Sequence, residues 1–230
     1  ELKLSVDRLK FEELFLVQLK AELAKQEKAV LRAAPILFQE DKIKAFVASL
    51  SFALTRTQKI SAWEILQDIA KTKPMNRLLS GDVGSGKTVV AAIALYNVFL
   101  NGYQAVMMAP TEILAQQHYQ SLEKLFGPLN IRVGLLTGSQ AKSTNCHSDN
   151  EGGISISSVV KTLDRDPSSL RLALDDKKSK KIIVAEINNG KLDVVVGTHA
   201  LLSEKVNFLK LGMVVVDEQH RFGVEQRKVI

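Results

Sequence analysis

The sequence has few of the residues that cross-link a chain or anchor it in a membrane. Its one cysteine, Cys146, has no partner for an internal disulfide, and no cluster of Cys and His has metal-ligand spacing. The longest apolar runs, such as Val89–Leu95, are much shorter than the roughly 18 residues of a membrane span. The first residues do not resemble a signal peptide. We therefore expect a cytoplasmic protein with no structural zinc and no membrane partner.

The rest of the composition is that of an ordinary globular protein. With 46% hydrophobic and 24% charged residues, the sequence is neither fibrous nor wholly disordered. A length of 230 residues predicts one large domain, or one and a half. The net charge of +6 favours a polyanionic partner, although a lysine-rich surface explains it equally well. Because the chain lacks an initial Met and ends at Ile230 within a charged segment, we expect a piece of a longer protein.

Three helices are predicted in the first third of the chain. Apolar residues recur at helical spacing from Asp7 to about Ala33, which predicts one long amphipathic helix. A second, shorter helix is predicted over Ile43–Leu50. Thr55 and Gln58 have the spacing of a capping box and open a third helix, which ends before Pro74.

Beyond Pro74, short apolar strands alternate with helices, the pattern of an α/β fold with a mostly parallel sheet. Helices are predicted to begin near Lys87, Thr111 and Lys180. The runs at residues 194–196 and 213–216 are apolar on both faces, which predicts central strands. The full set of predicted strands is Arg77–Ser80, Gln104–Ala109, Ile131–Leu136, Leu192–Val196 and Met213–Val216.

Two domain boundaries and one insertion follow from these patterns. We assign residues 1–50 to a helical connector and residues 51–230 to the α/β domain. Within that domain, residues 140–178 are rich in Ser, Asn, Asp and Gly, which predicts an exposed insertion with at most one short helix. In a parallel sheet with right-handed crossovers, the carboxyl ends of all strands share one edge. We expect the functional loops there.

A phosphate-binding loop is predicted directly before the helix at Lys87. The segment from Gly81 to Thr88 reads G-x-x-x-x-G-K-T and stands between a predicted strand and a helix, the required context. Backbone N–H groups of such a loop surround a phosphate at the amino terminus of the helix. Lys87 reaches the β- and γ-phosphates of ATP, and the Thr88 hydroxyl completes a Mg²⁺ shell. The nucleotide-binding residues are Gly81, Gly84, Ser85, Gly86, Lys87 and Thr88.

An acidic pair supplies the matching metal and water functions. Asp217 and Glu218 follow the apolar strand that ends at Val216. We expect Asp217 to hold Mg²⁺ and Glu218 to orient or deprotonate the attacking water, so that Lys87, Asp217 and Glu218 form the catalytic set. The guanine-reading pattern Asn-Lys-x-Asp is absent, which argues against a GTPase.

Gln58 has two interpretations that do not exclude each other. It closes the capping box with Thr55, or its amide reads the adenine edge with one donor and one acceptor. Phe52, a few residues earlier, stacks on the base or fills the core.

Small and hydroxyl-bearing residues follow three predicted strands, and these residues suit contacts to a nucleic-acid backbone that do not read its sequence. Ordinary turn chemistry explains each segment separately, and His199 is equally consistent with a structural histidine. The candidate DNA-binding residues are Pro110, Thr111, Glu112, Thr137, Gly138, Thr198 and His199.

Together these motifs closely resemble the RecG-type ATP-dependent DNA helicases of superfamily 2. The resemblance rests on Phe52–Gln58, Pro74–Ala91, Met108–His118, Leu135–Gly138, Val196–Leu201 and Val216–Val224. It implies a RecA-like first motor domain that uses ATP and Mg²⁺, acts as a monomer on branched or forked DNA, and serves in DNA repair and recombination. It favours the adenine-reading role of Gln58 and assigns coupling between nucleotide and DNA to Gln219 and His220. The helices before residue 50 resemble the connector to an upstream DNA-reading domain.

The resemblance also leaves alternatives open. Transcription-repair coupling translocases have similar motifs, but Ser85, Glu112 and the pair Gln219-His220 are closer to the RecG family. A non-catalytic DNA-binding remnant is the third alternative, against which the intact phosphate and acidic motifs argue. The insertion at 140–178 is longer than in the family. Since the second motor domain and its arginine finger lie beyond this chain, we expect nucleotide binding with slow hydrolysis and no unwinding.

Overall fold

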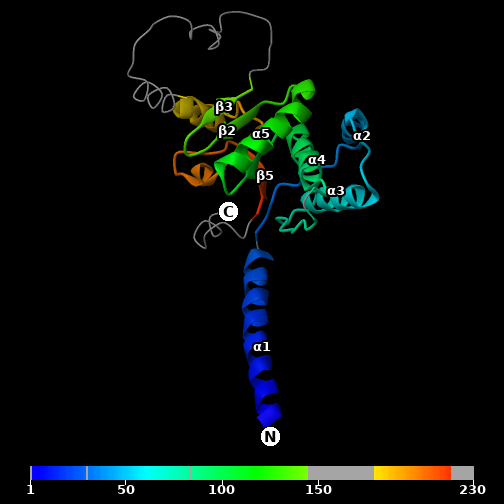
Figure 1. The fold of residues 1–230 in the computed structure, drawn as a ribbon, viewed down its shortest axis with the longest axis vertical. Helices are drawn as coiled ribbons and strands as arrows, with labels where there is room; N and C mark the ends of the chain where they lie inside the picture. The colour runs from blue at the N-terminus through cyan, green and yellow to red at the C-terminus, as the bar shows by residue number, and fades with distance from the viewer. Residues whose placement is uncertain (1, 30, 83, 145–178, 219–230) are drawn as a thin grey trace, which may run out of the picture.

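The computed structural model describes residues 2–29, 31–82, 84–144 and 179–218 of the chain. They form an α/β domain built on one five-stranded sheet, and a long first helix that leads away from it (Figure 1). The predicted α/β class is therefore confirmed.

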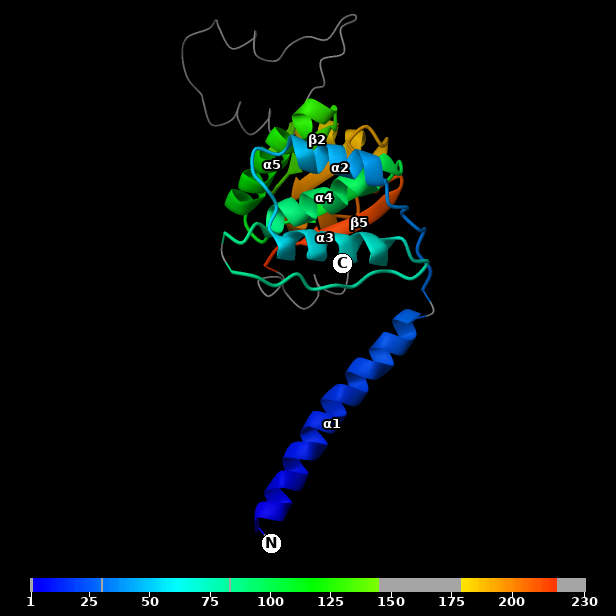
Figure 2. The same ribbon diagram turned by 90° about the vertical axis from the view of Figure 1, so that its right-hand side faces the viewer.

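The first helix, α1 (Leu2–Ala29), confirms the long helix predicted from Asp7 and begins five residues earlier. It projects from the α/β domain as a single rod (Figure 2). Its large apolar side chains between Val6 and Leu23 are 41–67% exposed. Phe11 and Phe15 stack on each other with ring centroids 5.9 Å apart. The described part of α1 thus contributes nothing to the core of the domain.

The next two helices pack into the domain itself. They are α2 (Glu40–Ser49) and α3 (Arg56–Ile69), and both lie against α4 (Lys87–Leu100). Phe46 of α2 is 2% exposed, and its ring lies 4.9 Å from that of Tyr96 in α4. Packing therefore joins α2 to the α/β domain, although the boundary predicted at residue 50 places it in the connector.

Two asparagines of α4 fix the segment that precedes α2. The amide oxygen of Asn97 accepts from Gln39 N at 3.0 Å, and that of Asn101 accepts from Leu37 N at 3.1 Å. Both side-chain amides donate to the carbonyl of Leu37. Asn97 is fully buried, and these bonds satisfy polar groups that would otherwise be costly to bury.

The sheet has the strand order β3-β2-β4-β1-β5 and is parallel except for β3. At the carboxyl edge, Met108 of β1 is opposite Gly197 of β4 and Val216 of β5. The prediction of a mostly parallel sheet is confirmed. The strands are β1 (Gln104–Met108), β2 (Val133–Leu136), β3 (Ala141–Ser143), β4 (Val194–Gly197) and β5 (Leu211–Val216).

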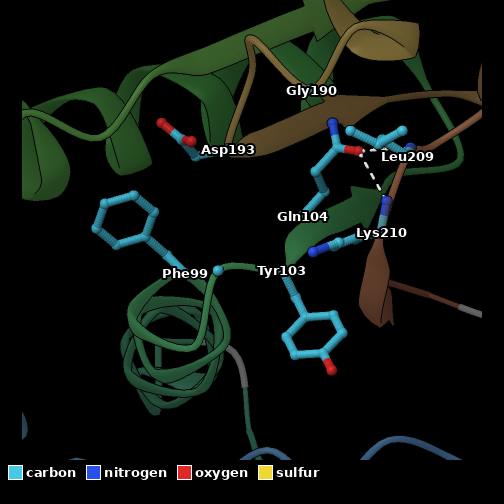
Figure 3. Close-up of a pocket in the computed structure, with 8 residues that line it drawn as sticks. Phe99, Tyr103, Gln104, Gly190, Asp193, Leu209 and Lys210 are labelled. Atoms are coloured by element: carbon cyan, nitrogen blue, oxygen red, sulfur yellow. Dashed lines mark hydrogen bonds between the residues drawn. The ribbon is translucent and has the colours of Figure 1, made fainter.

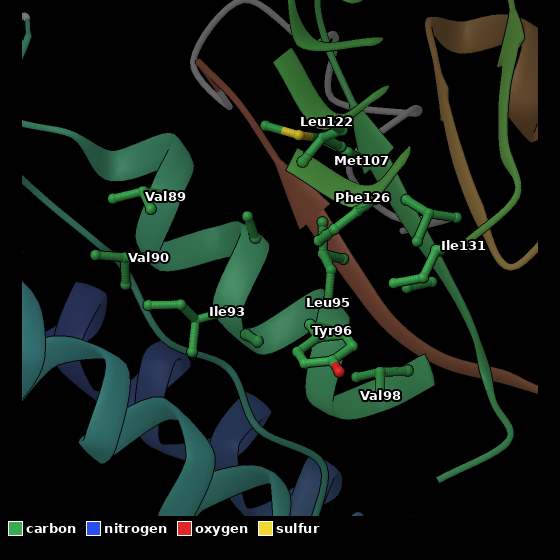
Figure 4. Packing of buried hydrophobic residues seen from close by; sticks show 14 of the residues in the cluster. Val89, Val90, Ile93, Leu95, Tyr96, Val98, Met107, Leu122, Phe126 and Ile131 are labelled. Atoms are coloured by element: carbon green, nitrogen blue, oxygen red, sulfur yellow. The ribbon is translucent and has the colours of Figure 1, made fainter. Parts of the chain in front are cut away.

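Helices cover both faces of the sheet, and each face has its own apolar cluster. On one face, α4 and α5 (Glu112–Phe126) pack on alternate residues of β1, including Met107 (Figure 4). On the other face, the helix that contains residues 179–188 packs on Val106 and Val195. This helix confirms the one expected near Lys180. Short 3₁₀ turns follow α5 at Gly127–Leu129 and β4 at His199–Leu202.

The strand predicted at Arg77–Ser80 is wrong. These residues form no strand, and Leu78 is 83% exposed. Instead, the Arg77 guanidinium lies 2.6 Å from carboxylate oxygens of both Glu64 and Asp68 in α3. These ion pairs hold the segment against α3, and Leu79 packs on the core without joining the sheet. In the described part of the chain nothing pairs with the outer side of β5, so β5, predicted as a central strand, is an edge strand.

The start of the predicted insertion is also corrected. Residues 141–143 form β3, which pairs antiparallel with β2. The Thr144 hydroxyl accepts from Val133 N at 2.9 Å and extends this pairing. A three-residue strand is too short for alternation to reveal it. The rest of the insertion, residues 145–178, lies outside the described residues.

Candidate nucleotide site and adjoining loops

The end of β1 holds the loops of the candidate site together. Asp217 N donates to Met108 O at 2.8 Å, and Ala109 N donates to Gly197 O at 2.8 Å. A β-carbon at Gly197 would lie 2.2 Å from Leu136 O, so only glycine fits there. The start of α4 and the end of β5 lie at the same end of the domain in both ribbon views (Figures 1 and 2). The carboxyl edge therefore gathers the predicted motifs.

The phosphate loop has a conformation that requires its glycines. Gly84 and Gly86 have φ values of 80° and 79°, in the left-handed region that other residues rarely adopt. Gly86 caps α4, so the free N–H groups at the start of that helix face the loop. The Lys87 ammonium donates to Gly81 O at 2.7 Å and to Asp82 O at 2.9 Å. The lysine side chain thus lies across the loop.

Gln58 forms the predicted capping box and also contacts the phosphate loop. Its side-chain oxygen accepts from Thr55 N at 2.9 Å, and Thr55 Oγ1 accepts from Gln58 N at 3.2 Å. Its amide nitrogen donates to Ser85 O at 2.8 Å. The capping interpretation is confirmed, and the same side chain ties α3 to the nucleotide loop.

The acidic pair lies at the end of β5, as predicted. Asp217 is partly buried, and its Oδ2 lies 2.7 Å from His118 Nε2 of α5. Glu218 is exposed and has φ of 49°, a left-handed conformation that is uncommon for a residue other than glycine. Asp217 and Glu218 thus form a turn directly after β5.

The residues present fit a Mg²⁺ ion. Magnesium prefers hard oxygen ligands and is usually held by one or two protein groups together with substrate phosphates and water. Asp217 offers a carboxylate, and Thr88 offers a hydroxyl in the first turn of α4, behind the glycine cradle. This donor set is small and entirely oxygen, which matches that pattern.

A hydrogen-bonded clasp joins two of the candidate DNA loops. Thr111 caps α5 by accepting from Leu114 N at 3.3 Å. The Glu112 carboxylate accepts from Ser139 N at 2.8 Å and from the Ser139 hydroxyl. The Lys180 ammonium donates to Gly138 O. The structure thus brings the loops after β1 and β2 together through Glu112.

The candidate DNA residues divide into exposed and buried groups. Thr111, Gly138 and His199 are exposed. Thr137 and Thr198, which the resemblance assigns either to contact with DNA or to support of the loops that make it, are only 2% and 1% exposed. Thr198 N donates to Leu136 O at 3.3 Å, so its amide is not available either. The buried threonines are placed to support these loops. Pro110 is half-buried at the end of β1.

Two predicted residues lie outside the described part of the chain, and two residues that make contacts in the site were not predicted from the sequence. Gln219 and His220, predicted to couple nucleotide to DNA, lie outside the described residues. His118 and Ser139 were not predicted as site residues. Helical spacing from Thr111 puts His118 two turns into α5, but only the fold shows that it reaches Asp217.

A hollow at the opposite edge of the sheet is structural. Its lining includes Phe99, Tyr103 and Gln104 (Figure 3). Gln104 is buried and donates to the carbonyls of Ile187 and Leu192, while its side-chain oxygen accepts from the amides of residues 209 and 210. Its polar atoms are therefore satisfied, and it fastens the loops at the amino ends of the strands.

The fold and the site together have the arrangement of a P-loop domain of the RecA-like class. A glycine-rich phosphate loop opens α4, and a carboxylate follows a parallel strand at the same edge. Among the described helices, none is both long enough and apolar enough to cross a membrane.

Comparisons with known proteins agree with this class. The DEAD/DEAH box helicase family matches residues 55–170. The ATP-dependent DNA helicase RecG of Streptococcus pneumoniae is 40% identical over 231 residues, or 100% of this chain and 29% of that protein. RecG of Staphylococcus aureus is 42% identical over 96% of this chain and 27% of that protein.

A solved structure supports the same conclusion. The structure of RecG bound to a three-way DNA junction matches with a TM-score of 0.73 and 38% identity, covering 94% of this chain and 25% of that one. The chain belongs to the DEAD/DEAH box helicase family. It is about 40% identical to RecG helicases along its whole length and spans between a quarter and a third of their length.

The Glu112 clasp can be tested by titration. The pKa of Glu112 lies below its ordinary value of 4.5, mainly because the Ser139 hydroxyl hydrogen-bonds to the carboxylate. A lowered pKa means that the clasp stabilises the fold above the ordinary pKa and is lost as the pH falls through the lowered value.

We predict that NMR titration of Glu112 gives a pKa below 4.5 and that Ser139→Ala moves it upward. Ser121→Ala, on the same helix but bonded to Gln117 O, serves as the control and leaves it unchanged. An identical Glu112 pKa in the parent chain and in Ser139→Ala would contradict the clasp.

Proposed function

We propose that this chain is the ATP-binding first motor domain of a RecG-like DNA helicase that remodels branched DNA in repair and recombination. The observation that carries the proposal is the identity of about 40% to RecG helicases along the whole chain. The relatives cited are RecG proteins, which favours this function over a transcription-repair translocase. The intact phosphate loop argues against a non-catalytic remnant.

Lys87 is the residue that we expect to respond first to nucleotide. Its ammonium is held by two neutral carbonyl oxygens, Gly81 O and Asp82 O. A phosphate oxygen carries more negative charge than a carbonyl, and charge-assisted hydrogen bonds are the stronger ones. The ammonium therefore turns from these carbonyls to the β- and γ-phosphates of ATP when nucleotide enters the loop.

The acidic pair completes the proposed reaction. Asp217 and Thr88 hold Mg²⁺, which neutralises charge on the phosphates when bound. Glu218 orients the attacking water and accepts its proton. Because Glu218 is exposed at the turn after β5, water reaches its carboxylate directly.

Adenine is proposed to bind beside α3. A hollow there is lined by residues from Val47 to Lys59, among them Phe52, which is 49% exposed. Gln58 stands in the first turn of α3 next to the phosphate loop. An adenine in this hollow stacks on Phe52 and exchanges a donor and an acceptor with the Gln58 amide.

DNA is proposed to run over the exposed loops at the carboxyl edge. Thr111, Gly138 and His199 are the exposed members of the candidate set. The polar groups of these residues suit contacts to the phosphate backbone of DNA. Such contacts imply binding without sequence preference. We further propose that α1 connects the motor to an upstream domain that covers its exposed apolar side chains.

Replacing Lys87 tests the nucleotide site directly. We predict that Lys87→Ala weakens ATP binding at least about tenfold, because a hydrogen bond to a charged group contributes roughly 1.5–3 kcal/mol. The measurement is titration with a fluorescent ATP analogue. Lys124→Ala, an exposed lysine on α5, is the charge-matched control. Equal affinity in Lys87→Ala and the control would overturn the proposal.

A second pair of variants separates the two roles of Gln58. Thr55→Ala removes the bond from Gln58 N to Thr55 Oγ1 but leaves the Gln58 amide in place, whereas Gln58→Ala removes the amide and its bond from Thr55 N but keeps the bond to Thr55 Oγ1. We predict that only Gln58→Ala loses the preference for ATP over GTP, and that both variants lose about 1 kcal/mol of stability. Competition titrations and urea unfolding measure the two effects. Equal loss of nucleotide preference in both variants would assign Gln58 to capping alone.

A further inference from the structure

His118 makes a contact that the nucleotide chemistry does not account for. Its Nε2 lies 2.7 Å from Asp217 Oδ2, between residues 99 positions apart in the sequence. The two side chains are 13% and 28% exposed, so water competes little for the bond. A carboxylate oxygen only accepts hydrogen bonds, so the ring nitrogen carries the hydrogen.

The contact leaves half of the carboxylate free. Oδ2 is occupied by the ring, which leaves Oδ1 as the oxygen that would bind an ion. Two bonds fix Asp217 at both ends, since its backbone N–H donates to Met108 O and its side chain accepts from His118. A carboxylate held in this way loses little further conformational entropy when a metal binds.

We propose that His118 is a positioning residue that orients the Asp217 carboxylate toward Mg²⁺. The inference rests on the proposed function, because it takes Asp217 as the metal-binding group of the nucleotide site. Hydrogen bonds to metal-binding carboxylates from neighbouring side chains set their orientation, and removing one typically reduces metal affinity or activity 10–100-fold.

The position of His118 also links the metal group to the DNA loops. Glu112, which clasps Ser139, lies six residues earlier on the same helix, or about 9 Å along its axis. Ala115 and Leu122 fix this helix in the core with 0% exposure. A shift of α5 produced at the DNA loops is therefore transmitted to the Asp217 carboxylate through a rigid element.

The test separates metal binding from nucleotide binding. Affinity for a fluorescent ATP analogue is measured in the intact protein with Mg²⁺ and again with EDTA, and the ratio of the two dissociation constants gives the gain due to metal. We expect His118→Ala to reduce this gain about tenfold and to leave the metal-free affinity unchanged. Gln117→Ala, its exposed neighbour, is the matched control and keeps the parent ratio.

Two conservative variants guard against a folding defect. The amide nitrogen of Gln reaches about as far as Nε2, so His118→Gln restores most of the gain, whereas the shorter His118→Asn does not. If His118→Ala fails to fold, the difference between Gln and Asn decides the question. The positioning role is overturned if the gain in ATP affinity due to metal stays at the parent value in both His118→Asn and His118→Ala. It is also overturned if these variants lose the same ATP affinity with and without Mg²⁺.

Lys87→Ala in the same assay tests the proposed function separately. It should weaken binding with and without metal. If it does not, the nucleotide site itself is wrong, whatever the His118 variants show.

Discussion

The pairing of β1 with both β4 and β5 is the constraint on which the site depends. Met108 is opposite Gly197 on one side and Val216 on the other, so the three strands end at the same position along the sheet. The Met108 carbonyl then accepts from Asp217 N, and Ala109 N donates to Gly197 O. Because the strands end together, the loops that follow them meet at one edge. A change of register in β1 would break the bonds of Met108 O to Asp217 N and of Ala109 N to Gly197 O together.

One helix connects two functions that are separate in the sequence. The first turn of α5 clasps the loop after β2 through Glu112, and its second turn contacts Asp217 through His118. The buried side chains of α5 pack on β2 and β4, so this helix cannot rotate without repacking the core. The fold therefore offers a direct physical route from the loops proposed to bind DNA to the carboxylate proposed to bind Mg²⁺.

Local pattern was sufficient for most of the fold but not for contacts between distant residues. Apolar runs predicted β1, β2, β4 and β5, and the spacing of Thr55 and Gln58 predicted the capping box. The strand expected at 77–80 failed because ion pairs from Arg77 to α3 hold that segment elsewhere. The edge position of β5 and the burial of Thr198 depend on the assembled sheet, which no window of sequence contains.

The location of the metal with respect to the sheet decides whether the carboxyl edge is the nucleotide site. Mn²⁺ bound together with nucleotide broadens the NMR signals of nearby amides. We expect broadening at Thr88 and Asp217, at the carboxyl edge, and sharp signals at Gln104 and Gly190, at the opposite edge. Broadening at Gln104 and Gly190 with sharp signals at Thr88 and Asp217 would show that the metal does not bind at the carboxyl edge.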